Sequence, residues 1–233
     1  MSEYLSNIEL FFTGPRNIGN TYIVIDGSDA KHIQKVMRHK IGDKIFVTDG
    51  KGRIYKGKIE KIKNGSLKIN KIDIIEYSEK YKNITICIPN LRKSNRLEFA
   101  IEKATELGIT NFIIFNSKRT ISKKVKIDRL NKIVLSAMKQ SLNCYLPKIT
   151  FQNSLSFLKD TNSGIVLFDQ ANKSMFNSSS LNTNKNYFLL FGPEGGFEKG
   201  EIPENIIISN FNLAPNRLRT ETAVVCVVSK LST

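Results

Sequence analysis

Short apolar runs separated by longer segments with helical spacing constrain the fold of this chain more than any other feature. The runs cover residues 84–88, 111–115, 164–168, 187–191 and 206–209. Strands that alternate with helices are typical of a parallel sheet with helices packed on its faces. Residues 95–107, which end before Gly108, and residues 128–142 carry the helical spacing. The sequence therefore predicts an α/β domain over this part of the chain.

The residues before this domain show a different pattern. Runs typical of β-strands cover residues 22–25, 44–48, 53–62 and 66–75. The pairs Asp49-Gly50 and Asn64-Gly65 are hairpin signals, and several short strands at this spacing predict a small β-barrel. Polar residues 76–83 separate the two patterns as a linker. We therefore predict a barrel domain over residues 1–77 and an α/β domain over residues 78–233.

One helix is predicted within the barrel domain, over residues 29–40. Its spacing turns Ala30, Ile33 and Met37 toward the core and leaves basic residues on another stripe. A basic stripe of this kind suits contact with phosphates, and it is equally consistent with a solvated helix face.

The charge of the chain favours a polyanionic partner. The chain has 36 Lys and Arg residues against 21 Asp and Glu residues, a net charge of +15. Composition alone also allows a basic surface that binds nothing. Basic residues on the barrel helix and near strand-to-helix turns are the candidate RNA contacts: Lys35, Arg38, Arg92, Lys93, Arg96, Lys118 and Arg119.

Several classes of protein are disfavoured by what the chain lacks. No apolar run approaches the roughly 18 residues that span a bilayer, and the N-terminus does not resemble a secretion signal, so we expect a cytoplasmic protein with no membrane partner. Its three cysteines are widely separated and predict free thiols. The two histidines belong to no cluster with metal-ligand spacing, and no metal is expected.

Two turns near the C-terminus, at residues 192–197 and 213–223, each follow an apolar run. Parallel strands end at the same edge of a sheet, where such folds bind ligands, so we expect the turns to lie together. The first turn lacks the Lys-Ser/Thr of a P-loop and the spacing of a dinucleotide motif. Its glycines allow close backbone approach to a heterocycle and ribose. S-adenosylmethionine, which carries no phosphate, fits these constraints, and an ordinary strand-to-helix turn is the alternative.

Charged residues also stand at the entrance of an apolar segment. Arg219 and Glu221 directly precede residues 223–228, which are apolar on all sides and predict a deeply buried helix. Charges in such a place need a partner or a ligand. A buried salt bridge and a ligand site both satisfy that need.

Together these residues resemble the ribosomal RNA small subunit methyltransferase E family of the SPOUT methyltransferases. Residues 192–197 and 218–223 are similar to the two signature cofactor loops of that family. Glu98, Lys103 and residues 106–108 are similar to one of its helices. Residues 11–12, His32, Val36, Arg38 and the pairs Gly42-Asp43 and Asp49-Gly50 are similar to its PUA-like barrel, which binds RNA.

The resemblance implies a fold and an activity. The expected fold is a C-terminal SPOUT domain, with a deep trefoil knot in a mostly parallel sheet, preceded by the PUA-like β-barrel. The expected activity is S-adenosylmethionine-dependent methylation of N3 of a uridine in 16S ribosomal RNA or the assembled small subunit, by a homodimer. Arg219 and Glu221 are the candidate catalytic residues: Arg219 would stabilise the uridine anion, and Glu221 would orient Arg219 or help to remove the proton.

The cofactor residues that the resemblance implies come from three loops. They are Phe168, Gly192, Pro193, Glu194, Gly195, Gly196, Leu213, Pro215 and Leu218. Departures from the family pattern occur at Lys139, Leu142, Asn143, Ala214 and Asn216, and we expect residues 139–143 near the active site. Pro203 predicts a shortened helix after the first turn. The alternatives are a non-catalytic ribosome assembly factor and a SPOUT methyltransferase that acts on transfer RNA.

Overall fold

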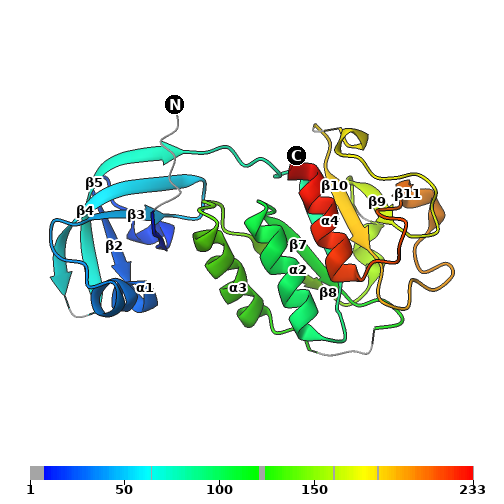
Figure 1. The fold of residues 1–233 in the computed structure, drawn as a ribbon, viewed down its shortest axis with the longest axis horizontal. Coiled ribbons are helices and arrows are strands. Elements are labelled where there is room, and N and C mark those ends of the chain that lie inside the picture. Colours follow the sequence, from blue (N-terminus) through cyan, green and yellow to red (C-terminus); the bar gives the residue numbers. More distant parts are fainter. Residues whose placement is uncertain (1–7, 64, 121–123, 160, 183, 233) are drawn as a thin grey trace. The chain divides into compact units, whose positions relative to one another are not determined.

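The structure, a computed structural model, describes residues 8–63, 65–120, 124–159, 161–182 and 184–232 (Figure 1). The chain forms two compact units. The N-terminal unit comprises Met1–Glu79 and Met138–Leu146, and the C-terminal unit comprises Lys80–Ala137 and Pro147–Thr233. Residues 138–146 therefore group with the barrel, whereas the sequence pattern predicts them in the second domain.

The N-terminal unit is built on a five-stranded sheet. Its strands are β1 (Leu10–Phe12), β2 (Tyr22–Asp26), β3 (Lys44–Thr48), β4 (Arg53–Lys63) and β5 (Ser66–Glu76), in the order β1-β3-β4-β5-β2. Neighbouring strands run antiparallel except β1 and β3. The hydroxyl of Thr13, just after β1, donates to the carbonyl of Val24 in β2 at 2.8 Å, so the two edge strands approach each other. This is the small PUA-like barrel that the sequence predicts, with β1 as the strand it did not predict.

Alternating apolar residues give this sheet its core. Ile23, Ile25, Ile69 and Val47 are fully buried on one face. Alternation with a period of two places such residues on the same side of a strand. At the predicted turn Asp49-Gly50, Gly50 has a φ of +70° and the Asp49 carboxylate accepts from the Lys51 amide at 2.8 Å. The second predicted turn includes Asn64, which lies outside the described residues.

The predicted helix over residues 29–40 is shorter and of mixed type. It consists of α1 (Gly27–Lys31) followed by a turn of π-helix, η2 (His32–Val36). Ala30 and Ile33 are buried as predicted, but Met37 is 44% exposed, so its predicted core position is wrong. The Met37 amide donates to the carbonyl of His32, five residues earlier, and this wider turn shifts the side chain off the core stripe. Arg38, with a φ of +56°, follows the end of the helix.

The C-terminal unit contains a wholly parallel six-stranded sheet. Its strands are β6 (Ile84–Pro89), β7 (Asn111–Phe115), β8 (Lys148–Gln152), β9 (Gly164–Phe168), β10 (Tyr187–Phe191) and β11 (Ile207–Phe211). Their order is β11-β9-β10-β6-β7-β8. All five predicted strands are confirmed to within two residues at each end, and β8 is the strand that the sequence did not reveal. The trefoil knot stays a prediction.

Helices α2 (Ser94–Glu106), α3 (Ile127–Gln140) and α4 (Thr220–Ser232) contribute to one core cluster, and α2 packs against α4 (Figure 1). Val224, Val227 and Val228 of α4 are fully buried. Residues 222, 225, 226 and 229 of the same helix are exposed or half-buried, so α4 buries one side and the prediction of burial all round is wrong. The opposite sheet face is covered by η3 (Leu155–Leu158) and by residues 197–207.

The connections agree with the sequence in part. After the glycine-rich turn, Pro203 precedes only a single 3-10 turn, η5 (Glu204–Ile206), which matches the predicted shortening. The Asn- and Ser-rich stretch from residue 172 contains one further 3-10 turn, η4 (Ser178–Ser180). All three cysteines are free, and Cys226 is half-buried. Among the described residues, no helix is long and apolar enough to cross a membrane.

Candidate functional site

A large pocket opens in the C-terminal unit at the carboxyl ends of β9, β10 and β11. Its volume is about 1150 Å³. Three strand-to-loop junctions line it: residues 168–170 after β9, residues 191–198 after β10 and residues 210–213 after β11. Residues 216–220, which lead into α4, complete the wall. The two turns that the sequence singled out thus meet at one sheet edge, as expected for a parallel sheet.

Aromatic side chains form one part of the pocket wall. The rings of Phe168 and Phe191 stack with centroids 4.9 Å apart, and Phe176 meets Phe168 edge-on at 5.2 Å. Phe211 also lines the pocket and packs against Phe176. Both stacked and edge-on pairs are favourable arrangements for aromatic rings. This cluster is apolar, which suits the burial of a flat ligand.

The glycine-rich turn is held to the start of α4. The Thr220 hydroxyl donates to the carbonyl of Gly192 at 2.8 Å. Gly196 adopts a φ of +70° and its amide donates to the Pro193 carbonyl at 2.8 Å, which closes the turn. A side chain at position 196 would be strained in this conformation, so glycine is required there for the turn itself. The turn therefore has a defined shape that does not depend on a ligand.

Side chains also tie the second turn and α2 to the glycine-rich turn. The Arg217 guanidinium donates to the carbonyl of Glu194 at 2.9 Å. Arg96, in the first turn of α2, forms an ion pair with the Glu194 carboxylate, and its Nε lies 3.4 Å from Oε1 of Glu221. Glu221 is 8% exposed. The sequence allowed a buried salt bridge at Glu221, and the partner in the structure is Arg96 and not Arg219.

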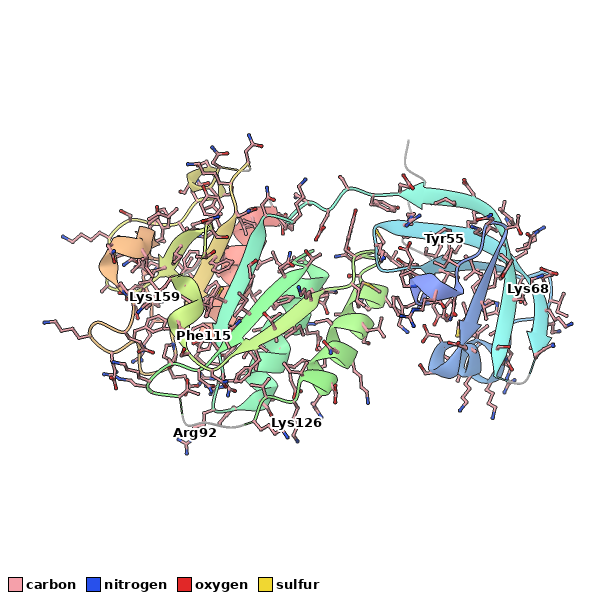
Figure 2. The ribbon with its side chains drawn as sticks, turned by 180° about the vertical axis from the view of Figure 1, so that it is seen from behind. Tyr55, Lys68, Arg92, Phe115, Lys126 and Lys159 are labelled. Carbon is pink, nitrogen blue, oxygen red and sulfur yellow. The ribbon has the colours of Figure 1, made fainter. Side chains whose placement is uncertain are left out.

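The other predicted RNA contacts are exposed, and Arg119 touches the glycine-rich turn. Arg119 donates to the carbonyl of Gly195, and its Nε lies 4.0 Å from Glu198. The backbone amide of Lys118 donates to Glu201 at 2.7 Å. The side chain of Arg92 projects from the margin of the ribbon in Figure 2. Lys93 in this unit and Lys35 and Arg38 in the N-terminal unit are also exposed.

Most of the predicted cofactor residues line the pocket. They are Phe168, Gly192, Pro193, Glu194, Gly195, Gly196, Leu213 and Leu218. Arg219 lines it as well, whereas Pro215 and Glu221 do not. The sequence did not single out several other lining residues, among them Asp169, Gln170, Ile202, Asn210 and Asn212. Four of these five residues lie within two positions of the end of a strand. Closeness to a predicted strand end is therefore the sequence signal that could have identified them.

Two buried oxygen atoms in this region have no hydrogen-bond partner within the part of the chain that the structure describes. They are Oδ1 of Asn210, a lining residue, and Oε2 of Glu221. A buried acceptor without a donor is costly, and such atoms are often found where a ligand or water completes the site.

The lining carries acidic Asp169, Glu194 and Glu198 beside its three arginines. That balance of charge does not resemble a phosphate site. Within the described residues, no group of three or more His, Cys, Asp or Glu side chains is placed to hold a metal ion.

Comparison with known proteins agrees with this arrangement. Residues 78–232 match the model of the RNA methyltransferase domain, and residues 25–72 match that of the RNA methyltransferase PUA domain. The chain is 30% identical to the ribosomal RNA small subunit methyltransferase E of Bacillus subtilis in an alignment 230 positions long that covers 89% of this chain and 88% of the relative. The chain belongs to the ribosomal RNA small subunit methyltransferase E family.

Solved structures share the fold of this methyltransferase E chain. A probable rRNA-methyltransferase from Porphyromonas gingivalis superposes with a TM-score of 0.83 at 27% identity, over 95% of this chain and 96% of the other. The ribosomal RNA small subunit methyltransferase E of Neisseria gonorrhoeae, bound to S-adenosyl methionine, superposes with a TM-score of 0.81 at 21% identity, over 96% of each chain. The two-part architecture is therefore that of the family, and the protein is an RNA methyltransferase by its family.

The segment that departs from the family pattern packs within the N-terminal unit. Lys139 forms an ion pair with Asp29 at 2.8 Å. The carbonyl of Cys144 accepts from the amide of Gly52 at 2.9 Å and from the hydroxyl of Thr48 at 3.3 Å. Leu142, one of the residues that depart from the family pattern, has a φ of +56°. Its placement near an active site stays a prediction.

Proposed function

We propose that this protein transfers a methyl group from S-adenosylmethionine to N3 of a specific uridine in 16S ribosomal RNA. The observation that carries the proposal is the pocket of about 1150 Å³ formed by three loops at the ends of neighbouring parallel strands. Membership of the methyltransferase E family supports the RNA substrate. The S-adenosyl methionine bound by the Neisseria gonorrhoeae relative supports the methyl donor.

The residues of the pocket fit such a donor. S-adenosylmethionine supplies an electrophilic methyl group on a positively charged sulfonium. Acidic side chains at Asp169, Glu194 and Glu198 suit a cation, and the aromatic wall suits adenine. The unused acceptor on Asn210 needs a donor, which an amino group of the ligand would provide. The backbone of residues 192–196 and 213–218 would hold adenine and ribose.

The chemistry of the acceptor assigns the task of Arg219. N3 of uridine carries a proton at neutral pH, and its loss leaves negative charge on the two uracil oxygens. Arg219 lines the pocket, is exposed, and has no ion-pair partner within 4.0 Å among the described residues. It is therefore the guanidinium available to stabilise that anion.

Glu221 has a different place. It lies outside the pocket lining and pairs with Arg96. This contact favours orientation of Arg96 by Glu221, in place of the predicted orientation of Arg219, over removal of the uridine proton.

The binding partners follow from the two units. Exposed basic residues in both units, including Arg38 and Lys93, would provide affinity for RNA phosphates. The half-buried side chains of Val225 and Cys226 share a stripe of α4 with exposed Thr222 and Ser229, which suits contact with a second copy in a homodimer. An enzyme with this substrate would work in the cytoplasm.

Replacing Arg219 tests the catalytic assignment. We expect Arg219→Ala to lower kcat by about 10²–10³-fold, as removal of a donor to a developing anion does, while the affinity for S-adenosylmethionine changes less than twofold. Glu221→Gln should lower turnover and, unlike Arg219→Ala, should also weaken the binding of S-adenosylmethionine, because the substitution alters the ion pair with Arg96. Calorimetry gives the affinity, and transfer of a labelled methyl group to 16S rRNA gives the rate. Arg129→Ala, an exposed arginine of α3 outside the pocket lining, is the matched control. Near-normal turnover in both site variants would contradict the assignment.

Two further measurements separate this function from its rivals. A purified protein that does not bind S-adenosylmethionine in calorimetry would favour a non-catalytic assembly factor. Mapping modified nucleotides in RNA from a deletion strain should show loss of one N3-methyluridine in 16S rRNA. Intact 16S rRNA with a methyl group missing from transfer RNA would instead support a methyltransferase for transfer RNA.

A further inference from the structure

Arg96 occupies a position that an RNA contact would not need. Only 19% of its side chain is exposed, and it points into the wall of the pocket. It lies in the first turn of α2, where a cation meets the positive end of the helix dipole. A guanidinium in that place is unfavourable unless anions compensate it.

The anions that compensate Arg96 come from two separate loops. One guanidinium is shared by Glu194, in the glycine-rich turn, and by Glu221, in the first turn of α4. Arginine holds its donors in a rigid plane, so two carboxylates bound to it are kept at a set separation. Glu194 and Glu221 thus fix the relative position of the two signature loops through one residue of α2.

Glu221 depends on this contact. It is 8% exposed, and among the described residues Arg96 is its only ion-pair partner. Its second oxygen is already buried without a donor. Removal of Arg96 would leave a buried carboxylate with no compensation, which is strongly unfavourable. The loop that carries Glu221 would then move.

We propose that Arg96 is a positioning residue of the methyl-donor site, which shapes the pocket by joining Glu194 to Glu221, and that it does not contact RNA. This inference rests on the proposed function, because the pocket it shapes is assigned there to S-adenosylmethionine. Arg96 acts through the two carboxylates. It needs no contact with the reacting atoms.

The test compares Arg96→Met and Arg96→Lys with Lys93→Met. Lys93 is an exposed cation three residues earlier in the same segment and lies outside the pocket lining, so it is the matched control. For each protein, calorimetry gives the Kd for S-adenosylmethionine, and filter binding to 16S rRNA at several salt concentrations gives the RNA affinity and its salt slope. Steady-state rates give KM for the methyl donor and kcat.

We expect Arg96→Met to weaken S-adenosylmethionine binding at least tenfold and to raise its KM, with RNA affinity and salt slope unchanged. Arg96→Lys should recover part of the lost affinity for S-adenosylmethionine. Its ammonium is a point charge that pairs well with one carboxylate, whereas the guanidinium pairs with two. Lys93→Met should leave cofactor binding unchanged. A purely structural role would lower kcat in proportion to the fraction of folded enzyme and would leave the KM of that fraction unchanged.

Two results would overturn the inference. In the first, Arg96→Met binds S-adenosylmethionine normally but loses RNA affinity with a smaller salt slope, which would make Arg96 an RNA contact. In the second, Arg96→Met changes neither affinity.

If Arg96→Met does not fold, the double variant Arg96→Met/Glu221→Gln removes the buried charge, and it should fold and still bind the cofactor weakly. Failure of the unmodified protein to bind S-adenosylmethionine would contradict the proposed function itself, so the two failures are distinguishable.

Discussion

Leu142 stands at a position where the backbone conformation is costly for its own side chain. Its φ of +56° lies in the left-handed region that glycine tolerates and leucine does not. The side chain packs beside Leu10, Ile54 and Cys144 in a small apolar cluster. A glycine would adopt this backbone conformation without strain, and leucine offsets its strain in part by packing.

Two substitutions at Leu142 separate strain from packing. Both Leu142→Gly and Leu142→Ala lose the packing of leucine, but only glycine relieves the strain. We expect Leu142→Gly to have a free energy of unfolding about 1 kcal/mol higher than Leu142→Ala, measured by urea denaturation. At Ser136, an exposed position inside α3, the same pair should show the reverse order, with alanine favoured by about 1 kcal/mol. Equal stability of the two Leu142 variants would show that the strain is absent.

Tyr55 makes the stability of the N-terminal unit depend on pH. Its ring is 2% exposed and its hydroxyl donates to Oδ2 of Asp49 at 3.1 Å (Figure 2). Burial, and next the negative charge of Asp49, raise the pKa of Tyr55 from 10.0 to about 12. The folded state therefore disfavours the phenolate more than the unfolded state does.

The sign of this effect follows from the raised pKa. The contribution of Tyr55 to stability is fully present below pH 10 and is lost as the pH rises through about 12. We expect the free energy of unfolding to fall by about 2–3 kcal/mol over that interval from this group. The free energy of unfolding of Tyr55→Phe should fall less over the same pH interval. Denaturant titrations at each pH measure this fall. An identical fall in both proteins would assign the loss to other groups.

At the scale of elements, amphipathic segments were predictable and their ends were not. The strands at residues 111–115, 164–168 and 187–191 are confirmed at both ends, because a buried parallel strand is a continuous apolar run bounded by polar residues. The barrel helix was wrong from residue 37 onward, because a turn of π-helix changes the spacing on which the prediction depends. Strand β8 has no fully buried residue, so it gave no apolar run to detect.

The junction between the glycine-rich turn and α4 is an element-scale target. Thr220 is 7% exposed, and its hydroxyl bond to Gly192 fixes the turn against the helix. Thr220→Val keeps the shape and removes the bond, so we expect S-adenosylmethionine to bind about five- to tenfold more weakly, equivalent to about 1 kcal/mol. Calorimetry measures the change. Thr21→Val, at an exposed position of the N-terminal unit, is the control, and equal affinities in the two variants would show that the bond does not shape the site.

At the scale of the whole molecule, the sequence by itself determined the class of fold, the order of nearly all the elements and the division into a barrel and an α/β part. These properties depend on periodicity within short segments, which a chain displays locally. It also determined which turns meet, because parallel strands end at a common edge. The net charge of +15 likewise indicates a polyanionic partner, because charge is a property of composition and does not depend on the fold.

Only the tertiary structure decided what the charged residues do. Arg96 and Glu194 are 98 residues apart in the chain, so no local pattern could pair them, and Arg96 was predicted to contact RNA. Residues 138–146 comprise the last residues of α3 and the segment after it, and they group with the N-terminal unit, whereas the sequence places them in the C-terminal domain. Ion pairs and burial depend on distances between remote segments, which chain folding sets and periodicity does not record. For that reason the residues of the pocket were largely predictable from the sequence, and the partners of its arginines were not.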